Sequence, residues 1–200
     1  MDKTARTRQL VGEDVFLKMQ NLRVAVFGLG AVGSFAIEAL ARCGVGYLRL
    51  IDFDTFNPTN LNRQIFALHS TLDLPKTVAA EQRVNDINPD CQLDIRNVFI
   101  DRNTINDLLQ PDVDVVIDAI DCVASKLELI KTAKAQQIPL ASSMGAGGRT
   151  QSDLIRMGDL FDVYNCPLAK VIRKRLRQSG IRSGVPCVYS VEKPRNTRAY

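Results

Sequence analysis

A glycine-rich loop between a predicted strand and a predicted helix constrains the fold of this chain more than any other feature. Residues 23–27, "RVAVF", are a short apolar run typical of a buried parallel strand. The loop "GLGAVG" follows, and residues 31–44 then form an alanine- and leucine-rich helix pattern. In such a unit Gly28 permits a tight turn, Gly30 lets the backbone approach a phosphate, and Gly33 lets helix and strand pack closely. The helix N-terminus favours an anion, so the loop predicts nucleotide binding. The alternative is a glycine turn that binds no ligand.

Strand and helix signals alternate along the rest of the chain. The pattern predicts strands at 47–52, 91–100, 113–120 and 138–144, and helices at 75–89, 104–110 and 124–137. This order indicates an α/β fold with a Rossmann-like, doubly wound, mostly parallel sheet and helices on both faces. We expect one domain over residues 1–200, with its core at 21–144. Residues 145–200 are expected to form an extension packed on the sheet, with a strand at 153–157, a basic helix and a strand at 185–191.

Composition and charge narrow the class of protein. The 200 residues are 46% hydrophobic, enough for one core, and the net charge of +4 permits an anionic partner without requiring one. No apolar run approaches the length of a bilayer span, and the first ten residues lack the apolar segment of a secretory signal. The five cysteines are widely spaced without a C-x-x-C pair. We therefore expect free thiols, a cytoplasmic location and no paired-cysteine zinc site.

The segment after the second predicted strand distinguishes between two nucleotides. Asp52 ends that strand, where an acid binds a ribose in dinucleotide folds, so an NAD enzyme fits up to this point. An NAD site needs little more, yet "FDTFNPTNLNRQ" follows. Asn60 can hydrogen-bond a polyphosphate or orient a neighbour, Arg63 can reach a phosphate as a fixed cation, and Gln64 extends the polar set. These groups favour ATP over a redox dinucleotide.

Three further charged residues complete the predicted ATP site. Lys76 begins a predicted helix, where it can meet a phosphate that also feels the helix dipole. Asp121 lies just beyond another parallel strand, at the sheet edge where open α/β sheets bind ligands. Asp54 stands two residues after Asp52, and it can turn toward a metal. Mg²⁺ prefers one or two carboxylates plus substrate phosphates, so Asp121 and Asp54 are the expected magnesium ligands.

The segments "GLGAVGS", "IDFDTFNPTNLNRQ", "PKTVAAEQRVNDINP" and "IDAID" together resemble one enzyme family. It is the ThiF-like adenylating domain shared by ubiquitin-activating enzymes and the bacterial molybdopterin and thiamine sulfur-carrier adenylyltransferases. The resemblance spans roughly residues 6–144. Carried over by position, it implies phosphate contacts from Gly28, Gly30, Gly33, Asn60, Arg63 and Lys76, ribose binding by Asp52, and a magnesium-associated acid at Asp121.

The resemblance also implies a symmetric homodimer. The family lends an N-terminal arginine across the dimer interface into the neighbouring ATP site. In "ARTRQLVGED" that residue is Arg6 or Arg8, with Arg6 favoured, and the alternative for either is a solvated basic terminus.

Features of the second half of the chain resemble one branch of this family. "NRQIFAL", "SSMGAGGRT" and "PLAKVIRKRLRQSGI" followed by "CVYS" are similar to the tRNA threonylcarbamoyladenosine dehydratases. The resemblance implies that ATP activates the carboxylate of the threonylcarbamoyl group on a tRNA adenosine. A neighbouring nitrogen or oxygen of the same group then attacks, which closes a ring with net loss of water. Chains of this branch run on past "CVYS", so the short end here is a possible cause of weaker tRNA binding or dimerisation.

The basic helix is the predicted RNA-binding element. Residues 170–182, "KVIRKRLRQSGIR", contain no acid, and Val171, Ile172 and Leu176 fall at helical spacing, so these apolar residues are expected to pack while the cations face outward. Such a face suits an RNA phosphate backbone, and the alternative is a solvated surface. The predicted RNA-binding residues are Lys170, Arg173, Lys174, Arg175 and Arg177.

Three functional hypotheses follow. The first is the dehydratase, in which Arg63, Lys76 and magnesium at Asp121 stabilise the charge that develops during adenylation, without a protein nucleophile. The second is adenylation of a ubiquitin-like sulfur carrier, with a sulfur-transfer protein as partner; the absence of paired cysteines counts against it. The third is a non-catalytic or NAD-linked module.

Four other residues carry weaker expectations. His69 is expected on the surface, and Cys187 in the core. Cys122 borders the site or, more in keeping with a cysteine, packs inertly. Lys126 faces the phosphates or caps a helical turn.

Overall fold

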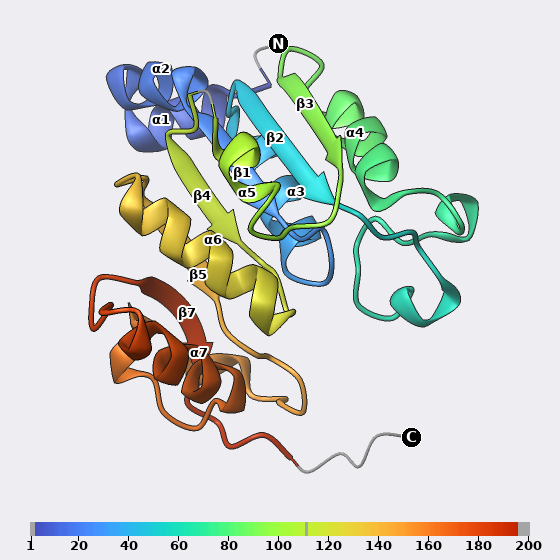
Figure 1. The fold of residues 1–200 in the computed structure, drawn as a ribbon. Helices are drawn as coiled ribbons and strands as arrows, with labels where there is room; N and C mark the ends of the chain where they lie inside the picture. Colours follow the sequence, from blue (N-terminus) through green and yellow to red (C-terminus); the bar gives the residue numbers. More distant parts are fainter. Residues whose placement is uncertain (1–2, 111, 196–200) are drawn as a thin grey trace.

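The computed structural model describes residues 3–110 and 112–195, and it contains a seven-stranded sheet with helices on both faces (Figure 1). The strand order is β3-β2-β1-β4-β5-β7-β6. The strands are β1 Arg23–Phe27, β2 Tyr47–Asp52, β3 Gln92–Asn97, β4 Val115–Asp118, β5 Leu140–Ser143, β6 Ile155–Asp159 and β7 Pro186–Ser190.

All strand pairs are parallel except the one between β6 and β7. The chain adds β2 and β3 on one side of β1, and it adds β4 and β5 on the other. The order therefore reverses between β1 and β4, which is where doubly wound sheets bind ligands at the carboxyl ends of their strands. The predicted fold class is confirmed.

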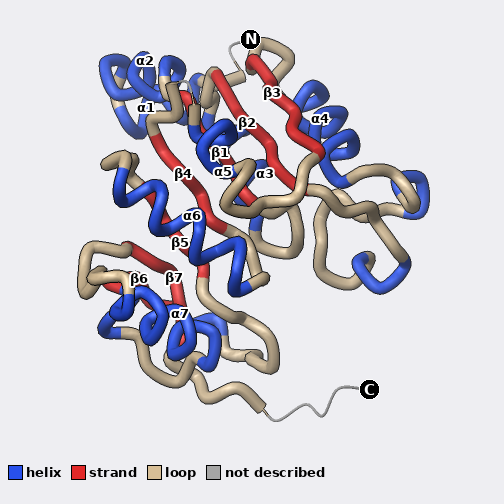
Figure 2. The backbone as a smooth tube through the Cα atoms, viewed as in Figure 1, coloured by secondary structure: helices blue, strands red, loops and turns tan. Residues whose placement is uncertain are grey.

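Two sets of helices cover the sheet. The longer helices are α3 Gly33–Cys43, α4 Lys76–Ile87, α6 Val123–Ala135 and α7 Pro167–Gln178, with the short α5 Ile105–Leu109 after β3. Residues of α3 and α4 share one buried apolar cluster with β1 and β2, and residues of α5, α6 and α7 share a second. Figure 2 shows these helices on the two faces of the strands. None of the described helices is long and apolar enough to cross a membrane.

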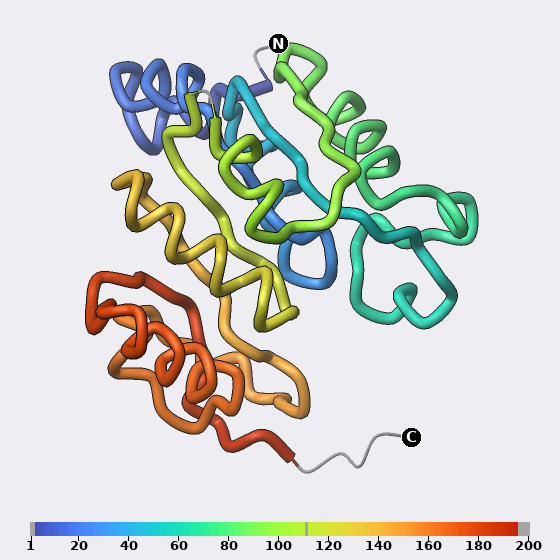
Figure 3. Tube along the Cα trace, viewed as in Figure 1, coloured from blue at the N-terminus to red at the C-terminus, as the bar shows by residue number. Residues whose placement is uncertain are grey.

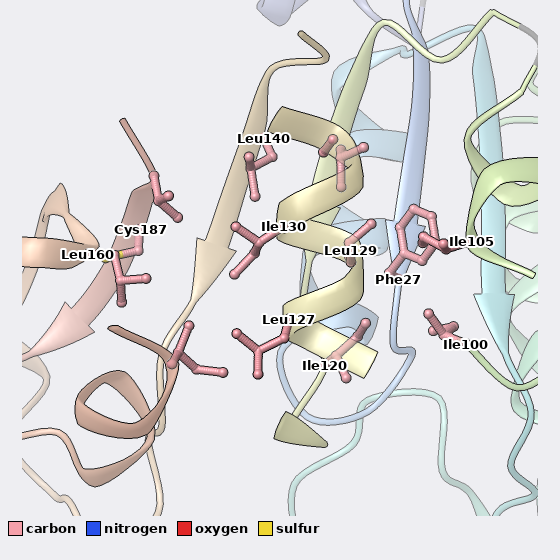
Figure 4. Packing of buried hydrophobic residues seen from close by; sticks show 14 of the residues in the cluster. Phe27, Ile100, Ile105, Ile120, Leu127, Leu129, Ile130, Leu140, Leu160 and Cys187 are labelled. Atoms are coloured by element: carbon pink, nitrogen blue, oxygen red, sulfur yellow. The ribbon is translucent and has the colours of Figure 1, made fainter. Parts of the chain in front are cut away.

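The segment after residue 145 packs into the main core. Leu160 and Cys187 belong to the same buried cluster as Phe27 of β1 and Ile130 of α6 (Figure 4). Strand β7 pairs with β5 and extends the same sheet. The expectation that Cys187 lies in the core is confirmed. All five cysteines are free, with Cys43 and Cys122 exposed and the other three buried.

Two N-terminal helices, α1 Ala5–Val11 and α2 Glu13–Asn21, were not predicted. They are short, charged and separated by Gly12, and most of their apolar side chains stay exposed, so no periodic pattern is visible in the sequence. Phe16 is the buried anchor, packed so closely on the turn after α3 that a Cβ on Gly44 would lie 2.9 Å from its ring. Figure 3 shows this segment, in blue, at the end of the sheet opposite the carboxyl ends of the strands.

Candidate active site

One pocket collects most of the predicted site residues at the carboxyl ends of β1, β2 and β4. Its volume is about 660 Å³. Of the residues predicted from the sequence, Gly28, Gly30, Asp52, Asp54, Asn60, Arg63, Gln64, Lys76 and Asp121 line it. They come from segments almost a hundred residues apart, so the fold, and not the sequence neighbourhood, assembles the site.

The glycine loop is shaped by two close approaches. Gly28 has φ +86°, and a Cβ there would lie 2.9 Å from the carbonyl oxygen of Ala119, so a side chain would be strained and would clash with the segment after β4. A Cβ on Gly33 would lie 1.8 Å from the carbonyl oxygen of Gly28, which means that α3 starts directly against the loop. Gly30 instead faces open pocket, with only the Gln64 amide 3.8 Å from a Cβ placed there.

Ser34 ties this loop to the polar segment after β2, and sequence reasoning missed it. The residue is fully buried, and its hydroxyl donates to the carbonyl of Gly30 at 2.6 Å. The same hydroxyl accepts from the backbone N–H of Ile65 at 3.3 Å. The only signal available in the sequence was a small hydroxyl side chain directly after the third glycine.

Asp52 holds two segments with one carboxylate. Its Oδ2 accepts from the N–H of Leu29 at 2.7 Å and its Oδ1 from the N–H of Asp54 at 2.9 Å. The carboxylate therefore fixes both the glycine loop and the chain after β2. Each oxygen keeps a further lone pair for a ligand, so ribose binding by Asp52 stays a compatible prediction.

The three polar residues after Asp54 are oriented by local bonds. The Oδ1 atom of Asn60 accepts from the N–H of Asn57 at 3.1 Å, which leaves the Nδ2 atom available to the pocket. Arg63 is exposed, and its guanidinium donates to the carbonyl of Thr59 at 2.7 Å. Gln64 is buried, and its Oε1 accepts no hydrogen bond from any described residue. An unsatisfied amide oxygen beside the glycine loop is expected where a polar ligand completes the site.

Lys76 and Asp54 form an ion pair inside the pocket. The Nζ atom of Lys76 lies 2.8 Å from Oδ2 of Asp54, and the lysine side chain is 7% exposed whereas the aspartate is 53% exposed. Both side chains line the pocket. The aspartate therefore holds the lysine in place and is still partly exposed to solvent. A metal ion bound by Asp54, as predicted, would have to share this carboxylate with Lys76.

Asp121 and Cys122 lie at the mouth of the pocket where α6 begins. Both are exposed, so the interpretation of Cys122 as inert packing is wrong, and the thiol borders the site instead. The first-turn N–H groups of α6, chiefly that of Ser125, lower the pKa of Cys122, while burial and the charge of Asp121 oppose them. The exposed carboxylate of Asp121 is available to a cation. His69 is on the surface, as predicted.

Beneath this turn lies a buried charged network that the sequence analysis did not identify. Lys126 and Asp118 are both 0% exposed and form an ion pair of 2.8 Å. The other Asp118 oxygen accepts from the hydroxyl of Ser142 at 2.6 Å, and the N–H of Ile120 donates to Oδ1 at 3.1 Å. Lys126 thus neither faces the phosphates nor caps a turn. An aspartate inside the apolar run "VVIDAI" was the available signal, because a fully buried charge requires a partner.

The basic helix differs from its prediction at two positions. Val171 is 40% exposed, while Ala169, Ile172 and Leu176 form the buried stripe. Arg173 is half-buried, and its guanidinium donates to the carbonyls of Leu160 and Val163. Ile172 and Leu176 are four positions, about one helical turn, apart. Arg173 directly follows Ile172, so it sits at the edge of the stripe and turns inward. Lys170, Lys174, Arg175 and Arg177 are exposed, as an outward cationic face requires.

The N-terminal arginines lie away from this pocket. Neither Arg6 nor Arg8 lines it, and α1 stands at the opposite end of the sheet. Arg8 stacks over the ring of Phe16 at 4.2 Å and forms an ion pair with Glu13. Arg6 is exposed, and its one hydrogen bond within the described part of the chain is a long contact with Gln9, at 3.4 Å.

Comparisons with known proteins point to one family. A sequence model described as "ThiF family" matches residues 4–188. The tRNA threonylcarbamoyladenosine dehydratase of Bacillus subtilis is 40% identical over 190 residues, which are 95% of this chain and 75% of the relative. The Escherichia coli enzyme of the same name is 37% identical over 193 residues, 93% of this chain and 72% of the relative. A crystal structure of the E. coli enzyme in complex with ATP has 35% identity and a TM-score of 0.95, covering 98% of this chain and 83% of that chain.

Proposed function

This chain belongs to the ThiF family, and on that premise we propose that it is an ATP-dependent tRNA threonylcarbamoyladenosine dehydratase. Among the family's reactions this one is favoured because two relatives that are 40% and 37% identical, over 95% and 93% of this chain, carry that name. As part of the same proposal, we infer that the enzyme acts on tRNA in the cytoplasm.

The observation that carries the proposal is that one pocket brings together several groups suited to adenylation. A glycine loop, an acid at the end of β2, two cations and an exposed acid at the start of α6 all line it. Hydride transfer to or from a dinucleotide does not require Arg63 and Lys76 beside the same phosphates. A related crystal structure binds ATP within the same fold.

In the proposed reaction the carboxylate of the threonylcarbamoyl group attacks the α-phosphorus of ATP, and pyrophosphate leaves. Lys76, held by Asp54, and the exposed Arg63 stabilise the charge that develops on the phosphate oxygens. A nitrogen or oxygen of the same threonylcarbamoyl group then attacks the activated carbonyl and expels AMP. One carboxylate oxygen leaves with AMP, so the nucleoside loses the elements of one water. Holding both ends of one side chain supplies the effective concentration.

Asp121 fits a magnesium ion better than Asp54 does. It is exposed at the pocket mouth, and Mg²⁺ is held in such sites by one or two carboxylates plus substrate phosphates. Asp54 already pairs with Lys76. No cluster of three or more metal-binding side chains occurs among the described residues, in keeping with an ion that is held largely by the nucleotide. When bound, the ion would neutralise phosphate charge.

A homodimer would complete the site with an arginine from its partner. Arg6 is better suited than Arg8, because Arg8 is engaged by Phe16 and Glu13. The position of α1 at the far end of the sheet means that Arg6 reaches an ATP site only in another subunit. Loss of AMP formation in Arg6→Ala, with rescue on mixing with a Lys76→Ala subunit, would support the lent arginine.

The test follows AMP and pyrophosphate release with tRNA that carries the threonylcarbamoyl group. We expect release to require the modified tRNA, with one water lost from the nucleoside by mass spectrometry. Asp121→Ala should abolish it, and Asp107→Ala, an exposed acid on α5 outside the pocket, should not. Turnover that needs a carrier protein ending in diglycine would replace the proposal with sulfur-carrier adenylation. If the protein does not bind ATP, both the dehydratase and the sulfur-carrier hypotheses are contradicted.

A further inference from the structure

A second cleft lies beside the nucleotide pocket and has no role in the proposed chemistry. Its volume is about 540 Å³. The segment 99–103 after β3, the first half of α6 and the C-terminal end of α7 form its walls (Figure 1). These three segments lie far apart in the sequence, and the last of them is the basic helix.

The cleft and the nucleotide pocket share a wall. Phe99, Ile100 and Ser125 line both. Phe99 is 46% exposed and meets the ring of Phe53 edge-on, with centroids 4.9 Å apart. Ser125 lies one turn from Asp121 and Cys122, which open the nucleotide pocket. A molecule that reacts in the pocket can therefore continue into the cleft without leaving the protein surface.

The charges of the cleft favour an anionic polymer. Arg102 and Arg175 are exposed, and their guanidinium groups form no hydrogen bond or ion pair with any described residue. Lys131 adds a third cation. Of the two acids, Glu128 is paired with Lys131 at 3.5 Å. Asp101 caps the following turn, and the N–H groups of Asn103 and Thr104 lower the pKa of its carboxyl. Arg102 also interacts electrostatically with Asp101, so of the three cations Arg175 is the one without an acidic partner among the described residues.

We propose that this cleft binds the sugar–phosphate backbone of the RNA strand that flanks the reacting adenosine. The inference rests on the proposed function, because it needs a nucleotide substrate in the adjoining pocket. An RNA strand is continuous with that substrate and carries one negative charge per nucleotide. The exposed face of Phe99 at the junction offers a surface on which a flanking base stacks.

The proposal moves the RNA path away from the outward face of α7. Arg175 lines the cleft, whereas its neighbour Lys174 is exposed on the same helix and does not. The two residues carry the same charge one position apart. Comparing their variants therefore distinguishes RNA binding in the cleft from RNA binding to the basic surface of the helix in general. The matched variants are Arg175→Gln and Lys174→Gln.

The experiment measures binding of a fluorescent tRNA transcript by anisotropy over a range of salt concentrations. Arg175→Gln and Lys131→Gln are each expected to weaken binding about fivefold at 0.1 M salt and to reduce the salt slope by about 0.7. Lys174→Gln should lose less than Arg175→Gln, and Lys18→Gln, an exposed cation on α2, should lose nothing. Equal losses in Lys174→Gln and Arg175→Gln would overturn the cleft in favour of the helix face.

A variant with the opposite sign excludes unfolding as the explanation. Glu128→Gln frees Lys131 and removes a negative charge from the wall, so it should tighten tRNA binding roughly twofold to fivefold. Weaker or unchanged binding would contradict the proposal. A polyglutamate peptide that binds as tightly as tRNA and responds to the same variants would reassign the cleft to an acidic protein.

Failure of the inference can be separated from failure of the proposed function. ATP affinity, measured by calorimetry, should be the same in all these variants, because none of the changed residues lines the nucleotide pocket. If wild-type protein releases AMP with modified tRNA but Arg175→Gln and Lys131→Gln leave tRNA affinity unchanged, only the inference fails. If tRNA binding follows the predicted order but no AMP forms, the proposed function fails while the cleft stands.

Discussion

Two lysine–aspartate pairs of equal length lie at the carboxyl ends of β4 and β2, the strands on either side of β1, and their surroundings differ. Lys126 and Asp118 are 2.8 Å apart with both side chains 0% exposed. Lys76 and Asp54 are also 2.8 Å apart, but the aspartate is 53% exposed in the pocket. The first pair has no access to a ligand and holds β4, β5 and the turn before α6 together. The second lines the pocket, where we propose that it keeps the lysine in place for an incoming anion. The two pairs have the same residue types and the same distance, so the exposure of the aspartate is what distinguishes a buried structural pair from one that a ligand can reach.

The buried pair should give the largest effect when broken. Lys126→Met leaves the Asp118 carboxylate in the core without its cation, and we expect the free energy of unfolding to fall by about 3–5 kcal/mol. Urea denaturation followed by circular dichroism measures it. The double variant Asp118→Asn with Lys126→Met should recover part of the loss, because no uncompensated charge then remains. A change below about 1 kcal/mol in the single variant would show that the pair does not hold this region.

The pocket pair should show the reverse pattern. Lys76→Met leaves Asp54 in contact with solvent, so stability should change by about 1 kcal/mol or less. Loss of a cation aimed at the developing phosphate charge should lower kcat/KM for AMP formation about 10²- to 10³-fold. The same unfolding curves and a coupled pyrophosphate assay decide it. If Lys76→Met proved as unstable as Lys126→Met, the two pairs would be equivalent and the comparison would fail.

The fold class and most of the residues that line the pocket could be predicted from the sequence because their signals are local. The strand–glycine loop–helix unit, the acid that ends β2 and the lysine that begins α4 each lie within a few residues of the pattern that marks them. What could not be predicted depends on partners distant in sequence. Lys126 finds Asp118 and Ser142 only once β4, β5 and α6 have assembled, and Arg173 turns inward because two carbonyls from residues 160 and 163 face it. The N-terminal helices lacked a pattern of their own, because only Phe16 is buried.

Ser34 tests whether the hydrogen bonds between segments of the pocket matter for ATP binding, as the buried ion pair is expected to matter for stability. Ser34→Ala removes the hydrogen bond that the hydroxyl donates to the Gly30 carbonyl and the one that it accepts from the Ile65 N–H, so the glycine loop and the polar segment lose their link. We expect KM for ATP to rise roughly tenfold, from the loss of about 1–2 kcal/mol of hydrogen bonding. Thr77→Val is the control, because that buried hydroxyl forms no hydrogen bond with the residues that the structure describes, and its removal should leave KM unchanged. An unchanged KM in Ser34→Ala would assign loop shape to the glycines alone.

Cys122 is expected to show the smallest effect. It lies at the start of α6, near Lys126 in the sequence, but it lines the pocket whereas Lys126 is fully buried. The N–H groups of that turn lower the pKa of its thiol, so thiolate is present at lower pH. Alkylation by iodoacetamide should therefore reach half its maximal rate at a pH below the ordinary thiol pKa of about 8.5.

ATP at a concentration equal to its Kd should slow the alkylation of Cys122 about twofold, because half of the pockets are then filled. Labelling of the exposed Cys43, outside the pocket, should not respond to ATP. Burial raises the pKa of Cys91 to about 11 and that of Cys187 to about 12, so these two should react only after unfolding. Cys122 labelling that ignores ATP would show that the mouth of the pocket stays open in the complex, and would move the nucleotide away from the start of α6.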